Sequence, residues 1–151
     1  MSSSNVDSGD GGDSKDRETG THLLPRFDAN GLITAVVCEQ TSNEPLMVAH
    51  MNREALDLSI STGEAHFYSR SRQEIWHKGG TSGNVLVIEE MRVDCDQDAV
   101  WLSVIPKGHG AVCHTGQKSC FFRRIVMKDG AVELESIGTE PLFDPKNVYQ
   151  S

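Results

Sequence analysis

The feature that most constrains the fold is an alternation of apolar and polar side chains in two segments, residues 84–94 and 100–106. A period of two is typical of a β-strand, because successive side chains point to opposite faces. We therefore predict one strand in each segment. The positions expected to share a face are Val85, Val87, Glu89, Met91 and Val93 in the first strand, and Val100, Leu102, Val104 and Pro106 in the second.

Turn and cap residues predict the remaining elements. Asn52 is suited to cap the start of one short helix, and Gly63 is suited to end it. Asp129-Gly130 predicts a tight hairpin turn. The predicted fold class is α+β, mostly β. The other strands are expected at residues 32–39, 46–51, 66–69, 121–127 and 132–135.

The composition divides the chain into a tail and one domain. Residues 1–20 are mainly Ser, Gly and Asp with scattered charge. Such a segment cannot bury enough apolar surface to offset the entropy of ordering it. We therefore expect a disordered N-terminal tail at residues 1–20 and a single domain at residues 21–151.

Charge and hydropathy exclude several classes of protein. The formal net charge is -8, which argues against a nucleic-acid partner, because nucleic-acid binding requires a basic surface. No apolar run approaches the roughly 20 residues that span a bilayer, and the N-terminus does not resemble a signal peptide. We expect a cytoplasmic protein with no membrane partner. Its four cysteines are then reduced thiols or metal ligands.

Three aspartates alternate at the predicted end of the first strand, at Asp94, Asp96 and Asp98. If the extended conformation continues, they share one face and Cys95 points to the other. Three neighbouring carboxylates repel one another unless a hard cation is present, and Mg²⁺ prefers such oxygen ligands. The residues predict a magnesium site, although a solvated acidic turn would have the same sequence.

Three cysteines predict a zinc site. Six residues lie between Cys113 and Cys120, which is wider than the spacing of common zinc knuckles. With Cys95 they provide three thiolates and leave a fourth tetrahedral position open, as in catalytic zinc sites. Two alternatives remain. The cysteines could be small buried apolar residues, or His114 or His109 could be a fourth ligand and make the site structural.

A third cluster, residues 76–84, predicts a ligand-binding loop. Its glycines allow close approach of the backbone, and its donors suit phosphate or ribose oxygens. An ordinary surface loop is the alternative. Arg70 and Arg72 add two cations just before it. The residues with suitable side chains are Trp76, His77, Lys78, Thr81, Ser82 and Asn84.

These clusters, in this order, resemble phosphoribosyl-AMP cyclohydrolase of histidine biosynthesis, over roughly residues 32–123. The departures are small, such as Gly80 where the family often has Ala. The matching motifs are residues 51–56, 62–66, 69–72, 76–84, 94–98 and 113–120.

The resemblance implies a small barrel-like β structure with short helices, intertwined as a homodimer. It implies a nucleotide substrate, AMP with a second ribosyl phosphate on N1, whose ring is opened between N1 and C6. It also implies Zn²⁺ on Cys95, Cys113 and Cys120, with the site shared between subunits, and Mg²⁺ on Asp94, Asp96 and Asp98.

Two histidines are candidates for the catalytic proton transfer. Hydroxide addition at C6 must be followed by departure of N1, which needs a proton. His114 is the first candidate because it follows a predicted zinc ligand, and His77 is the second. A zinc deaminase would use similar chemistry, but its His-x-Glu and Pro-Cys-x-x-Cys signature is missing. A structural zinc module is the non-enzymatic alternative.

Overall fold

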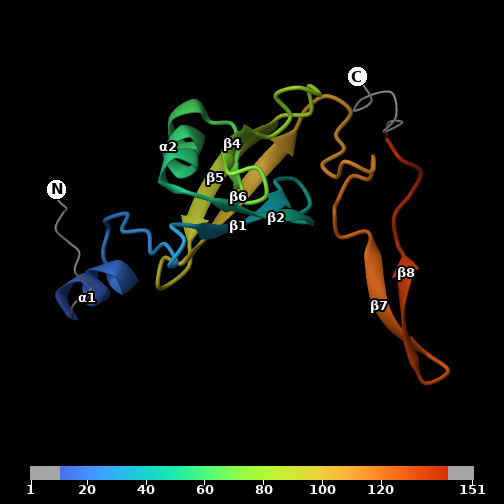
Figure 1. Ribbon diagram of the computed structural model, residues 1–151, viewed down its shortest axis with the longest axis horizontal. Helices are drawn as coiled ribbons and strands as arrows, with labels where there is room; N and C mark the ends of the chain where they lie inside the picture. Colours follow the sequence, from blue (N-terminus) through green and yellow to red (C-terminus); the bar gives the residue numbers. More distant parts are fainter. Residues whose placement is uncertain (1–10, 143–151) are drawn as a thin grey trace.

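A central sheet of four strands organises the computed structural model, which describes residues 11–142 (Figure 1). Its order is β2-β1-β6-β5, where β1 pairs in parallel with β6 and the other neighbours are antiparallel. The two segments with the strongest alternation are strands, as predicted, and the structure shows that they are neighbours in the sheet. The strands are β1 (Ile33–Glu39), β2 (Pro45–Met51), β5 (Leu86–Val93) and β6 (Ala99–Pro106).

Two hairpins complete the strands. One pairs β3 (His66–Ser69) with β4 (Glu74–His77), and the other pairs β7 (Arg123–Lys128) with β8 (Ala131–Ser136). The second hairpin has its turn at Asp129-Gly130, as predicted, and projects away from the sheet (Figure 1). Strand β4 was not predicted, because Trp76 and His77 were assigned to a loop.

The helix α2 (Arg53–Thr62) confirms both predicted caps. The Asn52 side chain accepts a hydrogen bond from the backbone N–H of Ala55, and Gly63 ends the helix with a left-handed φ of 76°. The helix buries Ala55 and Leu56 in the core. That core also contains large side chains from the sheet and from β3, namely Ile33, Val37, Leu46, Met51, Phe67, Leu86, Leu102 and Val104.

The face of β5 that contacts the core differs from the prediction. The register between β5 and β6 shifts between Ile88 and Glu90, which is a β-bulge. A bulge adds one residue and reverses the alternation beyond it. Leu86 and Ile88 therefore face the core before the bulge, and Met91 faces it afterwards. Strict alternation had placed only Met91 of these three on the predicted face.

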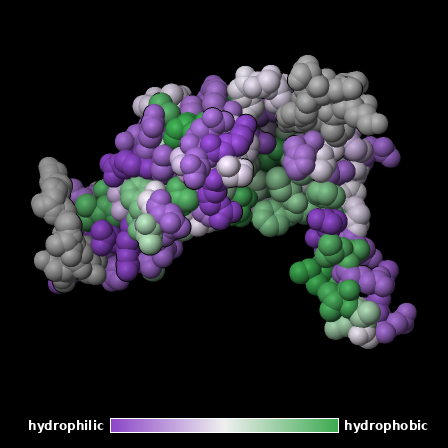
Figure 2. Space-filling model, viewed as in Figure 1, coloured by the Kyte–Doolittle hydropathy of each residue, from purple (hydrophilic) through white to green (hydrophobic). Residues whose placement is uncertain are grey.

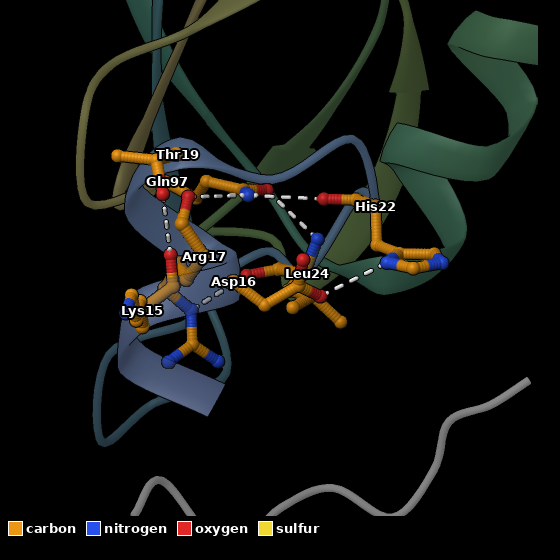
Figure 3. A network of polar contacts seen from close by, with 7 residues as sticks. All are labelled: Lys15, Asp16, Arg17, Thr19, His22, Leu24 and Gln97. Atoms are coloured by element: carbon orange, nitrogen blue, oxygen red, sulfur yellow. Dashed lines mark hydrogen bonds and ion pairs between the residues drawn. The ribbon is translucent and has the colours of Figure 1, made fainter. Parts of the chain in front are cut away.

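Part of the expected disordered tail is helical. Helix α1 (Gly11–Thr19) is followed by a segment fixed to the buried side chain of Gln97 (Figure 3). The amide nitrogen of the Gln97 side chain donates to the carbonyls of Arg17 (2.9 Å) and His22 (3.1 Å). The amide oxygen of the same side chain accepts from the Leu24 N–H (2.7 Å). Tertiary hydrogen bonds thus replace the missing apolar burial. Residues 1–10 of the expected tail lie outside the described residues.

The described strands do not close into a barrel. Over residues 11–142 they form one four-stranded and two two-stranded sheets, with β2 and β5 at the edges of the larger one. An isolated bridge between Glu64 and Val87 places the β3–β4 hairpin beside β5. No helix in this part of the chain is long and apolar enough to cross a membrane.

Candidate functional site

The turn between β5 and β6 gathers the three predicted aspartates. One oxygen each from Asp94, Asp96 and Asp98 lies within 4.8 Å of the others. The chain does not stay extended here: the Gln97 N–H donates to the Asp94 carbonyl (3.0 Å), and Gln97 has a φ of 56°. The cluster was therefore predicted correctly, but a tight turn rather than a shared strand face produces it.

The carboxylates interact strongly with one another. Hydrogen bonding to Asp96, and then to Asp94, raises the pKa of Asp98 to about 6, while the same contact lowers the pKa of Asp96. The backbone fixes one carboxylate oxygen of the cluster, since Asp94 Oδ1 accepts from the N–H groups of Asp98 (3.0 Å) and Ala99 (3.2 Å). A hard divalent cation would relieve this repulsion, so the residues fit Mg²⁺.

Replacing Asp98 with asparagine is expected to raise the melting temperature of the metal-free protein near neutral pH. Because the pKa of Asp98 is raised to about 6, the folded state holds this proton more tightly than the unfolded state does. The stability that the proton contributes is lost as the pH rises through about 6. The variant has no such loss, so its advantage should shrink towards pH 5. Calorimetry in a chelator at both pH values measures this.

Added magnesium should reverse the order of the melting temperatures of the wild type and Asp98→Asn. Mg²⁺ raises the melting temperature of a protein that binds it in the folded state. We expect a rise for the wild type and for the charge-matched control Glu89→Gln, whose side chain is exposed on β5, but little rise for Asp98→Asn. An equal rise for all three proteins would exclude the acidic turn as the magnesium site.

A cavity of about 460 Å³ opens beside two of the aspartates. Asp96 and Asp98 line it together with Arg26, Phe27 and Thr34, among others. Arg26 is exposed and offers a cation next to the carboxylates. Sequence reasoning missed Arg26, because no motif marks it: its backbone N–H is held by the Gln97 carbonyl (2.8 Å), a contact 71 residues distant in sequence that only the fold creates.

Two of the three predicted zinc ligands lie together. Cys113 and Cys120 flank a tight loop in which the Cys113 N–H donates to the Gln117 carbonyl (3.1 Å), and the Cys120 N–H donates to the Leu46 carbonyl (2.7 Å). Burial raises the pKa of the Cys120 thiol to about 11, and the neighbouring Cys113 thiol adds to this rise. The pair fits a soft divalent metal, whose binding would displace the thiol protons.

The third predicted zinc ligand lies elsewhere. Cys95 is exposed in the β5–β6 turn and lines a separate cavity of about 360 Å³ with residues of the N-terminal segment. Over the described residues, Cys95 does not join Cys113 and Cys120 in a group of three ligands; the acidic turn is the one such group found there. One chain therefore brings together two of the three cysteines.

The ammonium of Lys78 is directed to the interior and not to the surface expected for a phosphate ligand. Lys78 is 8% exposed, and Nζ donates to the Val112 carbonyl at 2.6 Å. Burial lowers the pKa of Lys78, whereas the thiols of Cys113 and Cys120 act in the opposite direction. The lysine also lies 5.3 Å from the ring centroid of Trp76. Its charge is thus placed to favour the thiolate form of Cys120.

Asn84 has a buried donor without a hydrogen-bond partner. The side chain is 2% exposed; its oxygen accepts from the His109 N–H (2.7 Å), whereas its Nδ2 has no partner. Such a group is uncommon in a folded protein and suits an acceptor on a ligand. Of the other predicted donors nearby, Thr81 is exposed, and the Ser82 hydroxyl accepts from the Asn84 N–H (3.3 Å).

His77 belongs to a small polar cluster. Its Nε2 lies 2.8 Å from the carboxylate of Glu64, and its ring stacks on His66 with a centroid distance of 4.5 Å and an angle of 8°. The pairing of β3 with β4 places His66 opposite His77. Glu64 and His66 were missed, because without β4 nothing in the sequence brings them to His77.

The remaining predicted residues are exposed, except Trp76, which is half-buried. His114 is exposed and directly follows Cys113. Arg70 and Arg72 are exposed between β3 and β4, and Arg72 Nε lies 3.6 Å from the Glu74 carboxylate. Trp76 packs against Phe67, with ring centroids 5.6 Å apart. The structure thus groups Lys78 with the two cysteines and separates both from the acidic turn of the same chain.

Comparison with known proteins shows which family the chain belongs to. The sequence profile of the phosphoribosyl-AMP cyclohydrolase family matches residues 47–122. Phosphoribosyl-AMP cyclohydrolase of Rhizobium leguminosarum bv. trifolii is 55% identical over 127 residues, which cover 84% of this chain and 85% of that protein. The same-named protein of Sinorhizobium fredii is 50% identical over 137 residues, covering 91% and 90%. That of Brucella anthropi is 55% identical over 122 residues, covering 81% and 86%. This chain therefore belongs to the phosphoribosyl-AMP cyclohydrolase family.

Proposed function

We propose that this protein hydrolyses the adenine ring of N1-(5-phosphoribosyl)-AMP between N1 and C6, giving the formimino carboxamide ribonucleotide of L-histidine biosynthesis. The observation that carries the proposal is the pair of thiols, Cys113 and Cys120, held together beside a buried lysine in a member of this family. Relatives with this name are 50–55% identical over most of their length.

The substrate chemistry defines what the site must supply. Substitution at N1 makes the six-membered ring cationic, so C6 is electrophilic. Addition of hydroxide there gives a tetrahedral carbon that carries two nitrogens. Collapse of this carbon breaks the bond to N1, which leaves with a proton. The protein must therefore position a nucleophile at C6 and a proton donor at N1.

Three thiolates would hold zinc, with the fourth position open. When bound, zinc supplies the nucleophile near neutral pH because it lowers the pKa of water from 15.7 to about 7. Cys113 and Cys120 would come from one chain, and Cys95 from the other chain of a homodimer. This arrangement is supported by the separation of Cys95 from the other two cysteines within one chain. The positive charge of Lys78 opposes the rise in the pKa of Cys120, and zinc binding would displace the remaining thiol protons.

Subunit complementation tests the shared zinc site. Pure Cys95→Ala and pure Cys113→Ala proteins should both be inactive, because every site lacks one ligand. After unfolding, mixing and refolding, a heterodimer regains one complete site, from Cys95 of one chain and Cys113 with Cys120 of the other. Random pairing in a two-fold dimer should therefore restore about a quarter of the wild-type activity. If mixing restores nothing while the wild type recovers in the same procedure, the three ligands come from one chain.

His114 is proposed to deliver the proton to N1. It is exposed, and it follows a zinc ligand directly, so it would lie beside the reacting carbon. His77 is the second candidate, and Glu64 would hold its ring through the contact to Nε2. An imidazole side chain can take up and release a proton near physiological pH, and this chemistry suits a histidine for the step.

The acidic turn and its surroundings are proposed to bind the phosphates. Asp94, Asp96 and Asp98 would hold Mg²⁺, which would allow so acidic a protein to bind a doubly phosphorylated ligand. Arg26 lies at the same cavity and would contact phosphate oxygens there. Other cations and hydrogen-bond donors would bind the rest of the substrate. These are Arg70, Arg72, Thr81, Ser82 and Asn84, with Trp76 packing nearby.

A further inference from the structure

Gln97 is the buried residue of the acidic turn. It is 3% exposed, whereas the aspartates of the turn are exposed or half-buried. A buried amide is unfavourable unless its polar atoms are hydrogen-bonded. Here the amide nitrogen and oxygen are both bonded, and their partners are the backbone groups of Arg17, His22 and Leu24 (Figure 3). The side chain of Gln97 therefore serves the N-terminal segment and not the carboxylates beside it.

Further contacts make residues 17–26 a closed unit around Gln97, which we call the N-terminal clasp. The Arg26 N–H donates to the Gln97 carbonyl (2.8 Å), so backbone and side chain of Gln97 are both held. Within the clasp, Arg17 Nε donates to the Leu24 carbonyl (2.9 Å). The clasp thus joins the acidic turn to residues that lie more than 70 positions away in the sequence.

The clasp is held mainly by these polar contacts. Helix α1, which leads into it, contains only glycine and hydrophilic residues, and hydrophilic surface lies at this end of the molecule (Figure 2). A helix of 9 residues is marginal on its own in water. Within residues 11–142, α1 makes no extensive contact with another helix or a strand. The order of this segment therefore depends on Gln97.

The acidic turn, in return, needs support against two unfavourable effects. One oxygen each from the three aspartates lies within 4.8 Å of the others, so their charges repel. Gln97 itself has a left-handed φ of 56°, which is unfavourable for a residue other than glycine. Both effects favour opening of the turn. Because the clasp fixes Gln97 through its side chain and its backbone, it opposes that opening.

We propose that Gln97 is a positioning residue of the magnesium site. Through the N-terminal clasp it holds Asp94, Asp96 and Asp98 in the arrangement that binds Mg²⁺, without contacting the ion itself. The inference rests on the proposed role of the acidic turn as the magnesium site. The coupling is reciprocal: Mg²⁺ stabilises the clasp by the same free energy with which the clasp strengthens Mg²⁺ binding.

Replacing Gln97 with methionine tests the clasp without changing any charge. Methionine has a similar length but cannot make the three hydrogen bonds. The matched control is Gln73→Met, since Gln73 also lies in a turn with a positive φ, of 53°, but is exposed. Calorimetric titration of the zinc-loaded full chain with Mg²⁺, well below the melting temperature, gives the dissociation constant. We expect Gln97→Met to raise it about tenfold and Gln73→Met to leave it unchanged.

Arg17→Ala tests the same coupling from outside the turn, and it does so even if Gln97→Met fails to fold. Loss of a cation would by itself favour Mg²⁺ binding, so weaker binding would show that the clasp is lost. The double variant should bind Mg²⁺ no more weakly than the weaker single variant, because both changes break one unit. Mg²⁺ should also slow hydrogen exchange of the Leu24 N–H in the wild type but not in Gln97→Met. A role in overall stability alone would produce none of these effects.

Three results would overturn the inference. These are equal dissociation constants for Gln97→Met and Gln73→Met, independent effects of the Arg17 and Gln97 substitutions, and exchange of the Leu24 N–H that does not respond to Mg²⁺. Asp98→Asn in the same titration identifies what has failed. If Asp98→Asn binds Mg²⁺ weakly while Gln97→Met binds it normally, the magnesium site stands and the clasp is wrong. If Asp98→Asn binds Mg²⁺ as tightly as the wild type, the magnesium site and the inference are both wrong.

Discussion

Replacing Cys113 with alanine is expected to abolish stoichiometric zinc binding and to lower kcat/KM by at least about a thousandfold. A single chain holds two of the three predicted zinc ligands together, Cys113 and Cys120. Loss of Cys113 therefore leaves no preformed pair. Metal-ion catalysis supplies several kcal/mol of transition-state stabilisation, and each 1.36 kcal/mol is a factor of about ten in rate. Metal analysis of the dialysed protein and steady-state kinetics measure the two effects.

Cys38→Ala is the matched control for this substitution. Cys38 is also a buried thiol, but it lies in β1 and in none of the ligand groups. Its loss should leave both zinc content and turnover close to those of the wild type. A Cys113→Ala protein that keeps one zinc per chain and near-normal turnover would show that Cys113 is a small buried apolar residue and not a ligand.

Replacing His114 with asparagine is expected to lower kcat by about a hundredfold to ten-thousandfold while zinc stays bound. General acid catalysis by a positioned side chain contributes about this factor. His114 is exposed, so the substitution removes little packing. Because the proton donor is gone, the variant should also lose one limb of the pH–rate profile. Zinc content, kcat and its pH dependence separate this effect from loss of the metal.

His77→Asn decides between the two histidines. His77 stacks on His66 and contacts Glu64, so its replacement should mainly disturb substrate positioning and raise KM. If His77→Asn instead gives the larger loss of kcat and the altered pH profile, the proton donor is His77. If His114→Asn retains zinc, near-normal turnover and the wild-type profile, the assignment of His114 is wrong.

Local patterns predicted most of the elements, because each depends on neighbouring residues alone. Asn52 and Gly63 cap α2 through their own side-chain and backbone preferences. Asp129-Gly130 forms its turn through φ values of 52° and 79°, which Asp and Gly tolerate. The aspartates of the acidic turn come together for a similar reason, since the turn at Gln97 that gathers them is itself local, with the Gln97 N–H donating to the Asp94 carbonyl.

What the sequence did not reveal depends on contacts between distant segments. The bulge in β5 is set by its pairing with β6, and it moved Leu86 and Ile88 to the core face. Gln97 holds the N-terminal segment by hydrogen bonds spanning more than 70 residues. The same segment brings Arg26 to the acidic turn. Hydrophobic periodicity does not reveal such contacts, because they leave the pattern of apolar and polar residues around each partner unchanged.

The direction of Lys78 was also beyond the sequence. A lysine in a glycine-rich loop is ordinarily exposed, and burial of its ammonium is unfavourable unless it is paired. Here the Val112 carbonyl and the two neighbouring thiols provide that pairing. All three belong to a loop that follows Lys78 by more than 30 residues, so only the tertiary fold could place them there.

The most direct test of the account is the reaction itself. Zinc-loaded protein with added magnesium is mixed with N1-(5-phosphoribosyl)-AMP, ring opening is followed by ultraviolet absorbance, and ammonia is assayed in the same sample. The account predicts ring opening without ammonia, and loss of the signal in Cys113→Ala but not in Cys38→Ala. Release of ammonia would indicate a deaminase, and no reaction with zinc still bound would indicate a structural zinc module; either result would contradict the proposed function.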